Sequence, residues 1–297
     1  MRRYVTVDVF TDRRFSGNPL AVVLDAEGLS QAEMQAIATE FNYSESTFVL
    51  PPEAPGHTAH VRIFTPTIEV PFAGHPNVGT AVVLAREWQA QGRPLPASFL
   101  FEEAAGLVPV RLDLNDGQVV GAELTAPEPL SVGAAVSLTD AAACVGLNAA
   151  EIVSATHAPV TASVGLRFLI VELASRAALA RAAGDLAVHA RVLAPLGTDG
   201  VFVYVRAPGA AALDARMFAP LDKVPEDPAT GSATVAALAL LAKLEAVDGE
   251  RHWRVIQGED MGRRSELNGR TVVRDGALVS VHVGGGAVEV MRGTLNV

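Results

Sequence analysis

Short segments in which apolar and polar residues alternate recur along the whole chain and predict a protein rich in β-strands. The first segment, 4–10, alternates from its first residue, and the apolar run 20–24 follows a turn at 17–19. The remaining predicted strands lie at 47–50, 59–65, 98–102, 107–114, 119–125, 160–161, 168–171, 200–206, 214–218, 252–257, 265–274, 277–283 and 287–291.

Five other segments follow the helical period. In the segment 29–41, Ser30 and Glu33 form a capping box ahead of apolar residues at helical spacing. Shorter helices are predicted at 81–88, 138–145 and 174–181, and a longer one at 233–244. The helices 81–88 and 233–244 are apolar on nearly every face, and such a helix has to be surrounded by protein.

Each of these two apolar helices follows a strand, a proline-bearing loop and a motif centred on glycine, so one pattern occurs twice. The motifs are Gly74-His75-Pro76 and Thr230-Gly231-Ser232. Free backbone N–H groups and the positive dipole end make a helix N-terminus an anion site. We therefore expect an α/β (α+β) fold of two similar halves. Each half would be a curved, mostly antiparallel sheet or β-roll wrapped around a central helix, and the cleft between the halves would hold a small carboxylate.

Residues 126–136 break both periodicities and carry few apolar side chains, which is typical of a domain boundary. The predicted N-terminal half is 1–126, completed by the C-terminal strand at about 287–297. The predicted C-terminal half is 127–286.

Two polar residues of the N-terminal half have both structural and functional interpretations. His75 lies on a predicted loop, where it either meets a ligand or makes a structural hydrogen bond that caps the helix. Glu45 belongs to the polar turn 42–47, which ends at a strand and lies at the rim of the fold. Taken alone, Glu45 has the features of a solvated turn carboxylate.

The polar residues of the second motif have the same ambiguity. Asp227 precedes Pro228, and Asp-Pro commonly begins a turn. Thr230 and Ser232 are ordinary N-cap residue types. None of the three is assigned to catalysis by its position alone.

The composition excludes several classes of protein. The chain has 297 residues, a formal charge of −10 and 49% hydrophobic residues, so it has ample apolar surface to bury. An acidic chain without a basic run disfavours nucleic acid as a partner. No apolar run reaches the roughly 20 residues of a membrane span. The single cysteine, Cys144, lies in an apolar stretch, which fits a buried residue and a cytoplasmic protein.

Common cofactor and metal motifs are missing from the sequence. It contains no phosphate-binding loop, no His-Glu-x-x-His, no Cys-x-x-Cys, no Gly-x-Gly-x-x-Gly and no Gly-x-Ser-x-Gly. The glycine run 284–286 lies between two predicted strands and is interpreted as a tight turn or bulge. These absences remove the usual phosphate-loop and zinc signatures, and a nicotinamide cofactor is not indicated.

Three signatures, in order along nearly the whole chain, resemble the phenazine biosynthesis PhzF-like family within the diaminopimelate epimerase fold. The first joins Val7-Asp8-Val9-Phe10 and Gly17-Asn18-Pro19 to Ser44-Glu45-Ser46. The second runs from Arg62-Ile63-Phe64-Thr65-Pro66 through Glu69 to Phe72-Ala73-Gly74-His75-Pro76. The third is Glu226-Asp227-Pro228-Ala229-Thr230-Gly231-Ser232-Ala233.

The resemblance implies a cofactor-free and metal-free isomerase, usually a homodimer, that moves a proton on a small carboxylated substrate. In the phenazine enzyme this substrate is trans-2,3-dihydro-3-hydroxyanthranilate. Glu45 would then be the acid/base, and His75 and Asp227 would complete the catalytic set. The resemblance assigns substrate binding to Asn18, Gly74, Thr230, Gly231 and Ser232.

One point follows from the residues themselves. Epimerases that resemble this fold exchange protons between two cysteines, whereas this chain has only Cys144, outside both glycine motifs. Proton transfer therefore has to use a carboxylate or an imidazole. One base on one face suits a shift within a molecule better than inversion of a stereocentre, and a glutamate in this role would need burial to raise its pKa.

The sequence departs from the family pattern at Asn77, where threonine is more usual, at Arg264, which replaces a frequent proline, and at Gly286. These departures concern the identity of the substrate. Two alternatives stay open: a non-catalytic homologue that binds small carboxylates, and a one-base epimerase or dehydratase of an amino-acid derivative.

Overall fold

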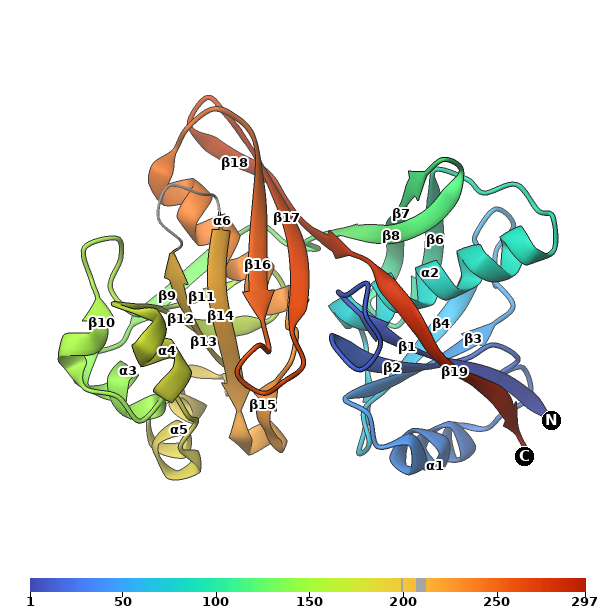
Figure 1. Cartoon of the computed structure of the whole chain (residues 1–297), viewed down its shortest axis with the longest axis horizontal. Helices are drawn as coiled ribbons and strands as arrows, with labels where there is room; N and C mark the ends of the chain where they lie inside the picture. The colour runs from blue at the N-terminus through green and yellow to red at the C-terminus, as the bar shows by residue number, and fades with distance from the viewer. Residues whose placement is uncertain (199, 207–211) are drawn as a thin grey trace. The chain divides into compact units, whose positions relative to one another are not determined.

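The computed structural model describes residues 1–198, 200–206 and 212–297 and divides into two compact units. Unit 1 comprises Met1–Thr125 and Gly284–Val297, and unit 2 comprises Ala126–Val283. Both are mixed α+β structures that consist mostly of sheet (Figure 1).

Unit 1 is a strongly curved sheet with two helices. Its strands pair in the order β19–β1–β2–β3–β4–β6–β7–β8, and the short β5 pairs with β4. Neighbours are antiparallel except β2/β3 and β4/β6, whose connections contain α1 and α2. The elements are β1 (Arg2–Val9), β2 (Asn18–Val23), α1 (Gln31–Phe41), β3 (Glu45–Leu50), β4 (Ala59–Phe64), β5 (Glu69–Val70), α2 (Gly74–Ala90), β6 (Ser98–Glu103), β7 (Gly106–Asn115), β8 (Gln118–Thr125) and β19 (Ala287–Leu295).

The sheet of unit 1 wraps around α2, which contacts β1, β2, β3, β7, β8 and β19. Every α2 residue from His75 to Ala85 is buried, as its apolar composition predicts. Gly79 allows this close packing, because a Cβ atom there would lie 2.5 Å from Leu20 Cδ2 and 2.8 Å from Val9 Cγ2. Inside the same interface, the hydroxyls of Thr47 and Thr80 form a buried 2.8 Å hydrogen bond that fixes α2 to β3.

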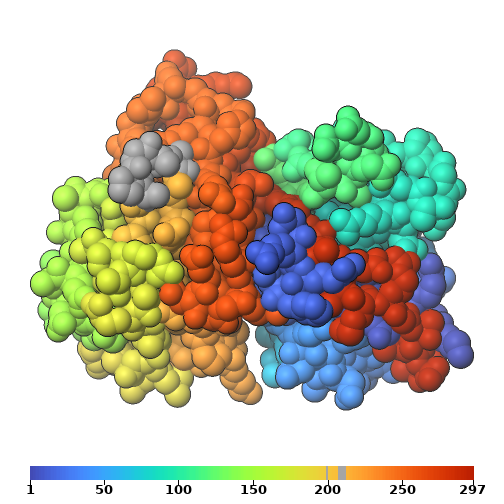
Figure 2. All heavy atoms as spheres, viewed as in Figure 1, coloured from blue at the N-terminus to red at the C-terminus, as the bar shows by residue number. Residues whose placement is uncertain are grey.

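The C-terminal strand completes unit 1. In Figure 2 the red C-terminal residues lie against the blue N-terminal ones, and β19 pairs with β1 along its length. The glycine run 284–286 forms no turn, so the turn that was one of its two predicted interpretations is wrong. Gly284 and Gly285 end β18 (Ala277–Gly285), and a Cβ atom at Gly284 would lie 2.6 Å from the Ala122 carbonyl oxygen. The run therefore lets two backbone segments approach closely.

Unit 2 repeats this plan around α6 (Gly231–Glu245). Its strands pair in the order β9–β11–β12–β13–β14–β16–β17, with β10 on β12 and β15 on β14. The remaining elements are β9 (Ser131–Ala135), α3 (Leu138–Cys144), β10 (Ile152–Val153), β11 (Val160–Ser163), β12 (Arg167–Leu173), α4 (Arg176–Arg181), α5 (Leu186–Val192), β13 (Val201–Arg206), β14 (Ala212–Ala219), β15 (Val224–Asp227), β16 (Gly249–Gln257) and β17 (Ser265–Arg274), with 3-10 turns at Ala149–Glu151, Ala194–Leu196 and Pro220–Asp222.

The sheet of unit 2 is covered by helices on both faces. α6 packs against β11, β12, β13 and β17, and its residues from Ala233 to Ala242 are buried. On the other face, α3, α4 and α5 cover a core that includes Leu169, Val171 and Val203. Cys144 is buried in this core as a small apolar residue. Strands buried on both faces explain why β12 and β13 are almost continuously hydrophobic.

The two units share side chains as well as topology. β4 contains Arg62 and Phe64, and β14 contains Arg216 and Phe218, each arginine lying over its phenylalanine ring. Each arginine also forms a bidentate ion pair with a glutamate on the next short strand, Glu69 or Glu226. Each glutamate lies five residues before the first glycine of the central helix. Corresponding positions in the units can therefore be compared directly.

Sequence periodicity found most elements but misplaced some boundaries. The central helix of unit 1 begins at Gly74, not at residue 81, because the glycine motif itself is helical. Pro76 is tolerated there because the first turn has no intrahelical partner for its nitrogen. The segment 126–136 contains the exposed strand β9, and α5 was not predicted. None of the described helices is both long and apolar enough to span a membrane.

Replacing Gly79 with alanine should destabilise the protein, because the new methyl group meets Leu20 and Val9 in a packed interface. We expect a loss of about 1–3 kcal/mol in the free energy of unfolding, measured by urea denaturation. Ala90→Leu adds more volume at an exposed position of the same helix and should change stability by less than about 0.5 kcal/mol. Equal effects of the two substitutions would contradict this account of the packing.

Candidate functional site

Unit 1 brings four of the sequence-predicted site residues onto neighbouring elements. Asn18 begins β2, Glu45 begins β3, and these strands run parallel side by side. Gly74 and His75 form the first turn of α2. Glu45 therefore lies on a strand, which corrects its predicted place in the preceding turn. The turn is shorter because Asn42 takes the left-handed conformation (φ 52°) and reverses the chain directly after α1.

His75 faces the Glu45 carboxylate from the first turn of α2. The distance from His75 Nε2 to Glu45 Oε2 is 3.5 Å, and the two side chains are 6% and 20% exposed. The predicted loop position of His75 is wrong, since it is the second residue of the helix.

The state of the His75 ring follows from its surroundings. The ring donates a hydrogen bond to the backbone carbonyl of Pro19, and burial lowers the pKa of His75 to about 3. Nε2 has no hydrogen-bond partner among the described residues, so Nδ1 is the donor to Pro19. A neutral ring with its proton on Nδ1 presents the Nε2 lone pair towards Glu45.

The first turn of α2 has the features of an anion site. Its N-cap, Ala73, has extended backbone angles and supplies no side-chain cap. The backbone N–H groups of the first turn are therefore not satisfied by a capping side chain, and the helix dipole adds positive potential there. The Asn77 side chain donates a 3.1 Å hydrogen bond to the Ala73 carbonyl oxygen and braces the turn from inside the helix.

Unit 2 brings the other predicted residues together at the N-terminus of α6. Asp227 ends β15, Thr230 is the N-cap, and Gly231 and Ser232 begin the helix. The Thr230 hydroxyl donates a 2.5 Å hydrogen bond to Asp227 Oδ2 instead of capping the helix. Thr230 therefore occupies the N-cap position, as its residue type suggests, but its side chain positions Asp227 and does not cap the helix.

Gln257 is a positioning residue that sequence reasoning missed. It is fully buried at the end of β16. Its amide nitrogen donates to the Asp227 carbonyl oxygen at 2.8 Å and to Thr230 Oγ1 at 3.0 Å. Its amide oxygen accepts from the Thr230 backbone N–H at 3.1 Å. These contacts span about thirty residues of sequence, so no local pattern distinguishes this glutamine.

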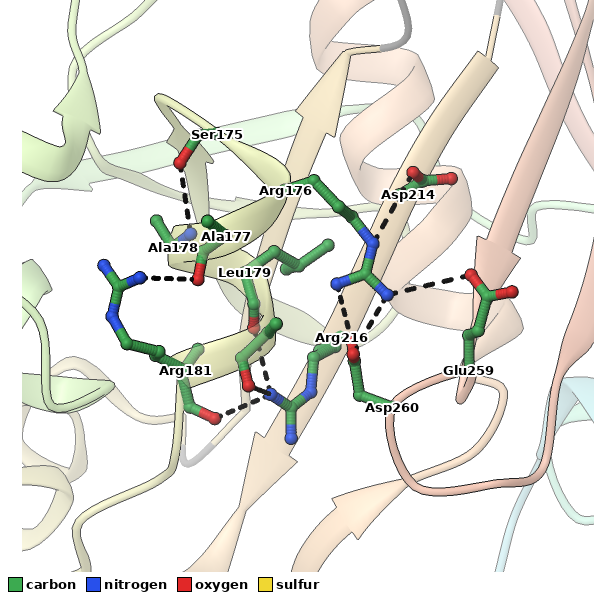
Figure 3. A network of polar contacts seen from close by, with 12 residues as sticks. Ser175, Arg176, Ala177, Ala178, Leu179, Arg181, Asp214, Arg216, Glu259 and Asp260 are labelled. Atoms are coloured by element: carbon green, nitrogen blue, oxygen red, sulfur yellow. Dashed lines mark hydrogen bonds and ion pairs between the residues drawn. The ribbon is translucent and has the colours of Figure 1, made fainter.

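A second group of contacts holds the strand that carries Asp227. The adjacent residue, Glu226, forms the bidentate ion pair with Arg216, at 2.7 Å for both bonds. Arg216 Nη1 also donates to three carbonyl oxygens at the end of α4, from Leu179, Ala180 and Ala182 (Figure 3). A guanidinium with this many acceptors is fixed in one orientation.

Arg176 extends the network at the other end of α4. It pairs with Asp214 on β14 and with Glu259 and Asp260 in the loop after β16 (Figure 3). The same loop begins at Gly258, where a Cβ atom would lie 2.7 Å from the Pro228 carbonyl oxygen. The segment 226–230 is therefore held from both sides by strands and by the loop after β16.

No convergent metal-ligand set occurs in the parts of the chain that the structure describes: residues 1–198, 200–206 and 212–297 contain no group of three His, Cys, Asp or Glu side chains placed to bind one ion. The polar groups gathered at the starts of α2 and α6 are carboxylates, an imidazole, hydroxyls and backbone N–H groups.

Comparison with known proteins agrees with this description. The model of the family described as "Phenazine biosynthesis-like protein" matches residues 7–293. An uncharacterized isomerase of Mesorhizobium japonicum is 39% identical over 99% of this chain and 98% of its own length. A trans-2,3-dihydro-3-hydroxyanthranilate isomerase of Pseudomonas chlororaphis is 34% identical, covering 99% of both chains. A PhzF-family crystal structure from Bacillus anthracis superposes with a TM-score of 0.86 over 100% of this chain and 99% of its own, at 24% identity.

Fold and relatives together define the protein as an isomerase with two sheet-wrapped helices. The chain belongs to the phenazine biosynthesis-like family. The predicted family, the α+β fold class and the isomerase class are thereby confirmed.

His75 should remain neutral, with its proton on Nδ1, at about pH 5, because burial disfavours the imidazolium. Nitrogen-15 NMR of the histidine rings measures this directly, and a His75→Gln variant identifies the signal. A ring that becomes doubly protonated at about pH 6 would contradict the assigned state.

Replacing Gln257 with methionine keeps the volume but removes all three hydrogen bonds to Asp227 and Thr230. We expect unfolding free energy to fall by about 1–3 kcal/mol or more, because buried backbone groups lose their partners. Isomerase activity should fall as well, since Asp227 is no longer held. His252→Met, at an exposed position of the same strand, is the control for both measurements and should leave them unchanged.

Proposed function

We propose that this isomerase moves a proton within a small cyclic carboxylate and that Glu45 is the acid/base. The observation that carries this proposal is the pairing of Glu45 with neutral, buried His75 in the helix turn suited to bind an anion. The proposed acid/base, Glu45 on β3, and the proposed anion site, the first turn of α2, therefore lie on adjacent elements of one unit. A carboxylate bound by the first turn of α2 would have its ring close to Glu45.

The proposed reaction needs only one base. Glu45 removes a proton from one carbon, the electron pair shifts through a neighbouring double bond, and Glu45 returns the proton to a second carbon. The atoms and charge of the substrate are unchanged, so no oxidant or reductant takes part. The Nε2 lone pair of His75 accepts a hydrogen bond from protonated Glu45 or from a substrate hydroxyl, which orients the acid between the two steps.

We propose that the polar groups at the N-terminus of α6 in unit 2 also bind substrate. Asp227 is oriented by Thr230 and Gln257, and it would accept a hydrogen bond from a hydroxyl or amino group of the ring. The backbone of Gly231 and the side chain of Ser232 would bind a carboxylate oxygen at the start of α6. Asn18 would contact the substrate from the start of β2.

The relatives suggest which substrate to test first. The Pseudomonas relative is named for trans-2,3-dihydro-3-hydroxyanthranilate, a cyclic carboxylate with hydroxyl and amino substituents. Such a molecule matches the proposed donors and acceptors, so we propose this compound or a close analogue. The homodimer and the cytoplasmic location stay predictions.

The test is proton exchange in heavy water, followed by NMR of the ring protons of dihydro-hydroxyanthranilate. The wild-type protein should convert the compound and incorporate deuterium. Glu45→Gln should be slower by at least about 100-fold, because the acid/base is lost while the shape is kept. Glu40→Gln, an exposed position on α1, is the matched control and should retain full activity.

Full turnover by Glu45→Gln would disprove the assigned role. Binding of the compound without any exchange by the wild-type protein would instead favour the non-catalytic alternative. Stabilisation of the protein by small carboxylates, measured as a shift in melting temperature, separates binding from chemistry.

A further inference from the structure

The repeat between the units identifies an unusual buried acid, Glu103. In unit 2, Ala215 of β14 pairs with Gln257, the last residue of β16. In unit 1, His60 of β4 pairs with Glu102, so the next step of the register brings Val61 opposite Glu103, the last residue of β6. Since Arg62 and Arg216 correspond, Glu103 occupies the position of Gln257.

The two equivalent residues differ in how their polar atoms are satisfied. Both atoms of the Gln257 amide are hydrogen-bonded to the segment before α6. Glu103 is only 8% exposed, yet neither of its carboxyl oxygens has a hydrogen-bond partner among the described residues. An ionised carboxylate in this position would be among the most costly groups to bury.

The Asn77 side chain does not satisfy Glu103 fully. Burial raises the pKa of Glu103, and the Asn77 amide nitrogen is near enough to Glu103 to oppose this rise, although no bond of ordinary hydrogen-bond geometry forms between them. The Asn77 nitrogen is engaged with the Ala73 carbonyl oxygen at 3.1 Å, and Asn77 Oδ1 is buried without a hydrogen-bond partner in the described structure. Asn77 Oδ1 and both Glu103 oxygens are therefore buried acceptors without a bonded donor, although the Asn77 amide nitrogen lies near Glu103. One proton on Glu103 supplies the missing donor.

Among the described residues, the cationic side chains that line the same cavity as Glu103 are paired with other carboxylates. Glu103 lines a cavity of about 300 Å³ together with charged side chains from β4, β5, β6 and the loop before β4. Those charges pair with one another: Arg62 with Glu69, His60 with Glu53, and Glu102 with His57. Both Arg62 bonds to Glu69 are 2.7 Å long, which holds the guanidinium on β5.

We propose that Glu103 is a positioning residue kept as a neutral carboxylic acid, which donates its proton to Asn77 Oδ1 and so keeps the first turn of α2 able to bind a carboxylate. This inference rests on the proposed function of that turn. Consistent with it, burial raises the pKa of Glu103 to about 8.

When Glu103 ionises, its negative charge lies near the anion site, in addition to the charge of the bound carboxylate. Ionisation also replaces the donor that faces Asn77 by an acceptor, which loosens the brace from Asn77 to Ala73. Both effects weaken carboxylate binding as the pH rises through the pKa of Glu103. The folded protein binds this proton and the unfolded chain has lost it above about pH 4.5, so stability also falls between that pH and about 8.

The test compares wild type with Glu103→Gln and with Glu102→Gln as the matched control. Glu102 is the preceding residue, and backbone hydrogen bonds from the loop before β4 lower its pKa to about 2. Infrared difference spectra should show the carbonyl band of a protonated carboxylic acid in wild type at about pH 6. The band should persist in Glu102→Gln and be absent in Glu103→Gln.

Binding of anthranilate, measured by calorimetry, is the second readout. Wild-type affinity should fall about tenfold between pH 7 and pH 9.5, whereas the affinity of Glu103→Gln should stay constant because its amide cannot ionise. The stability of Glu103→Gln should also vary less with pH than that of wild type.

Absence of the carboxylic acid band, or its presence in Glu103→Gln, would overturn the protonated state of Glu103. An identical pH dependence of anthranilate affinity in both proteins would overturn its role at α2. If anthranilate binds at no pH, the proposed anion site and this role both fail, while the band still decides the state of Glu103.

Discussion

Burial of most of the length of a helix inside a curved sheet is the constraint on which the rest of this structure depends. The sides of α2 and α6 are covered by apolar strand residues, so only the ends of the helices can carry polar chemistry. The N-terminal end has unsatisfied N–H groups and positive potential. Each unit therefore has one place suited to an anion, and the candidate site residues gather there.

Keeping such an end in position requires polar contacts with the segment before it. Both units have an arginine–glutamate pair that joins the short strand before the helix to the neighbouring strand. In unit 2 the arginine also meets the end of α4, and Gln257 fixes the segment that carries Asp227. The bidentate arginine–glutamate pairs allow their side chains little movement, which suits a site whose reacting groups need fixed geometry.

The repeat also shows where the two units have diverged. Unit 1 holds the acid/base candidate beside a neutral histidine, whereas unit 2 holds an aspartate fixed by a threonine and a glutamine. Equivalent positions carry Glu103 in unit 1 and Gln257 in unit 2. The same architecture thus carries different polar groups at the start of its central helix in each unit, and the difference lies in a few polar substitutions.

The sequence by itself determined most of the strands and helices, the two apolar central helices, the repeat of the glycine motifs and the family, because periodicity and motifs are local properties. It also excluded a two-cysteine mechanism by composition. Only the tertiary structure placed Glu45 on β3, brought His75 within 3.5 Å of it, and showed the buried roles of Gln257 and Glu103. These facts depend on contacts between distant segments, and burial, which sets the protonation of His75 and Glu103, exists only once those segments have packed.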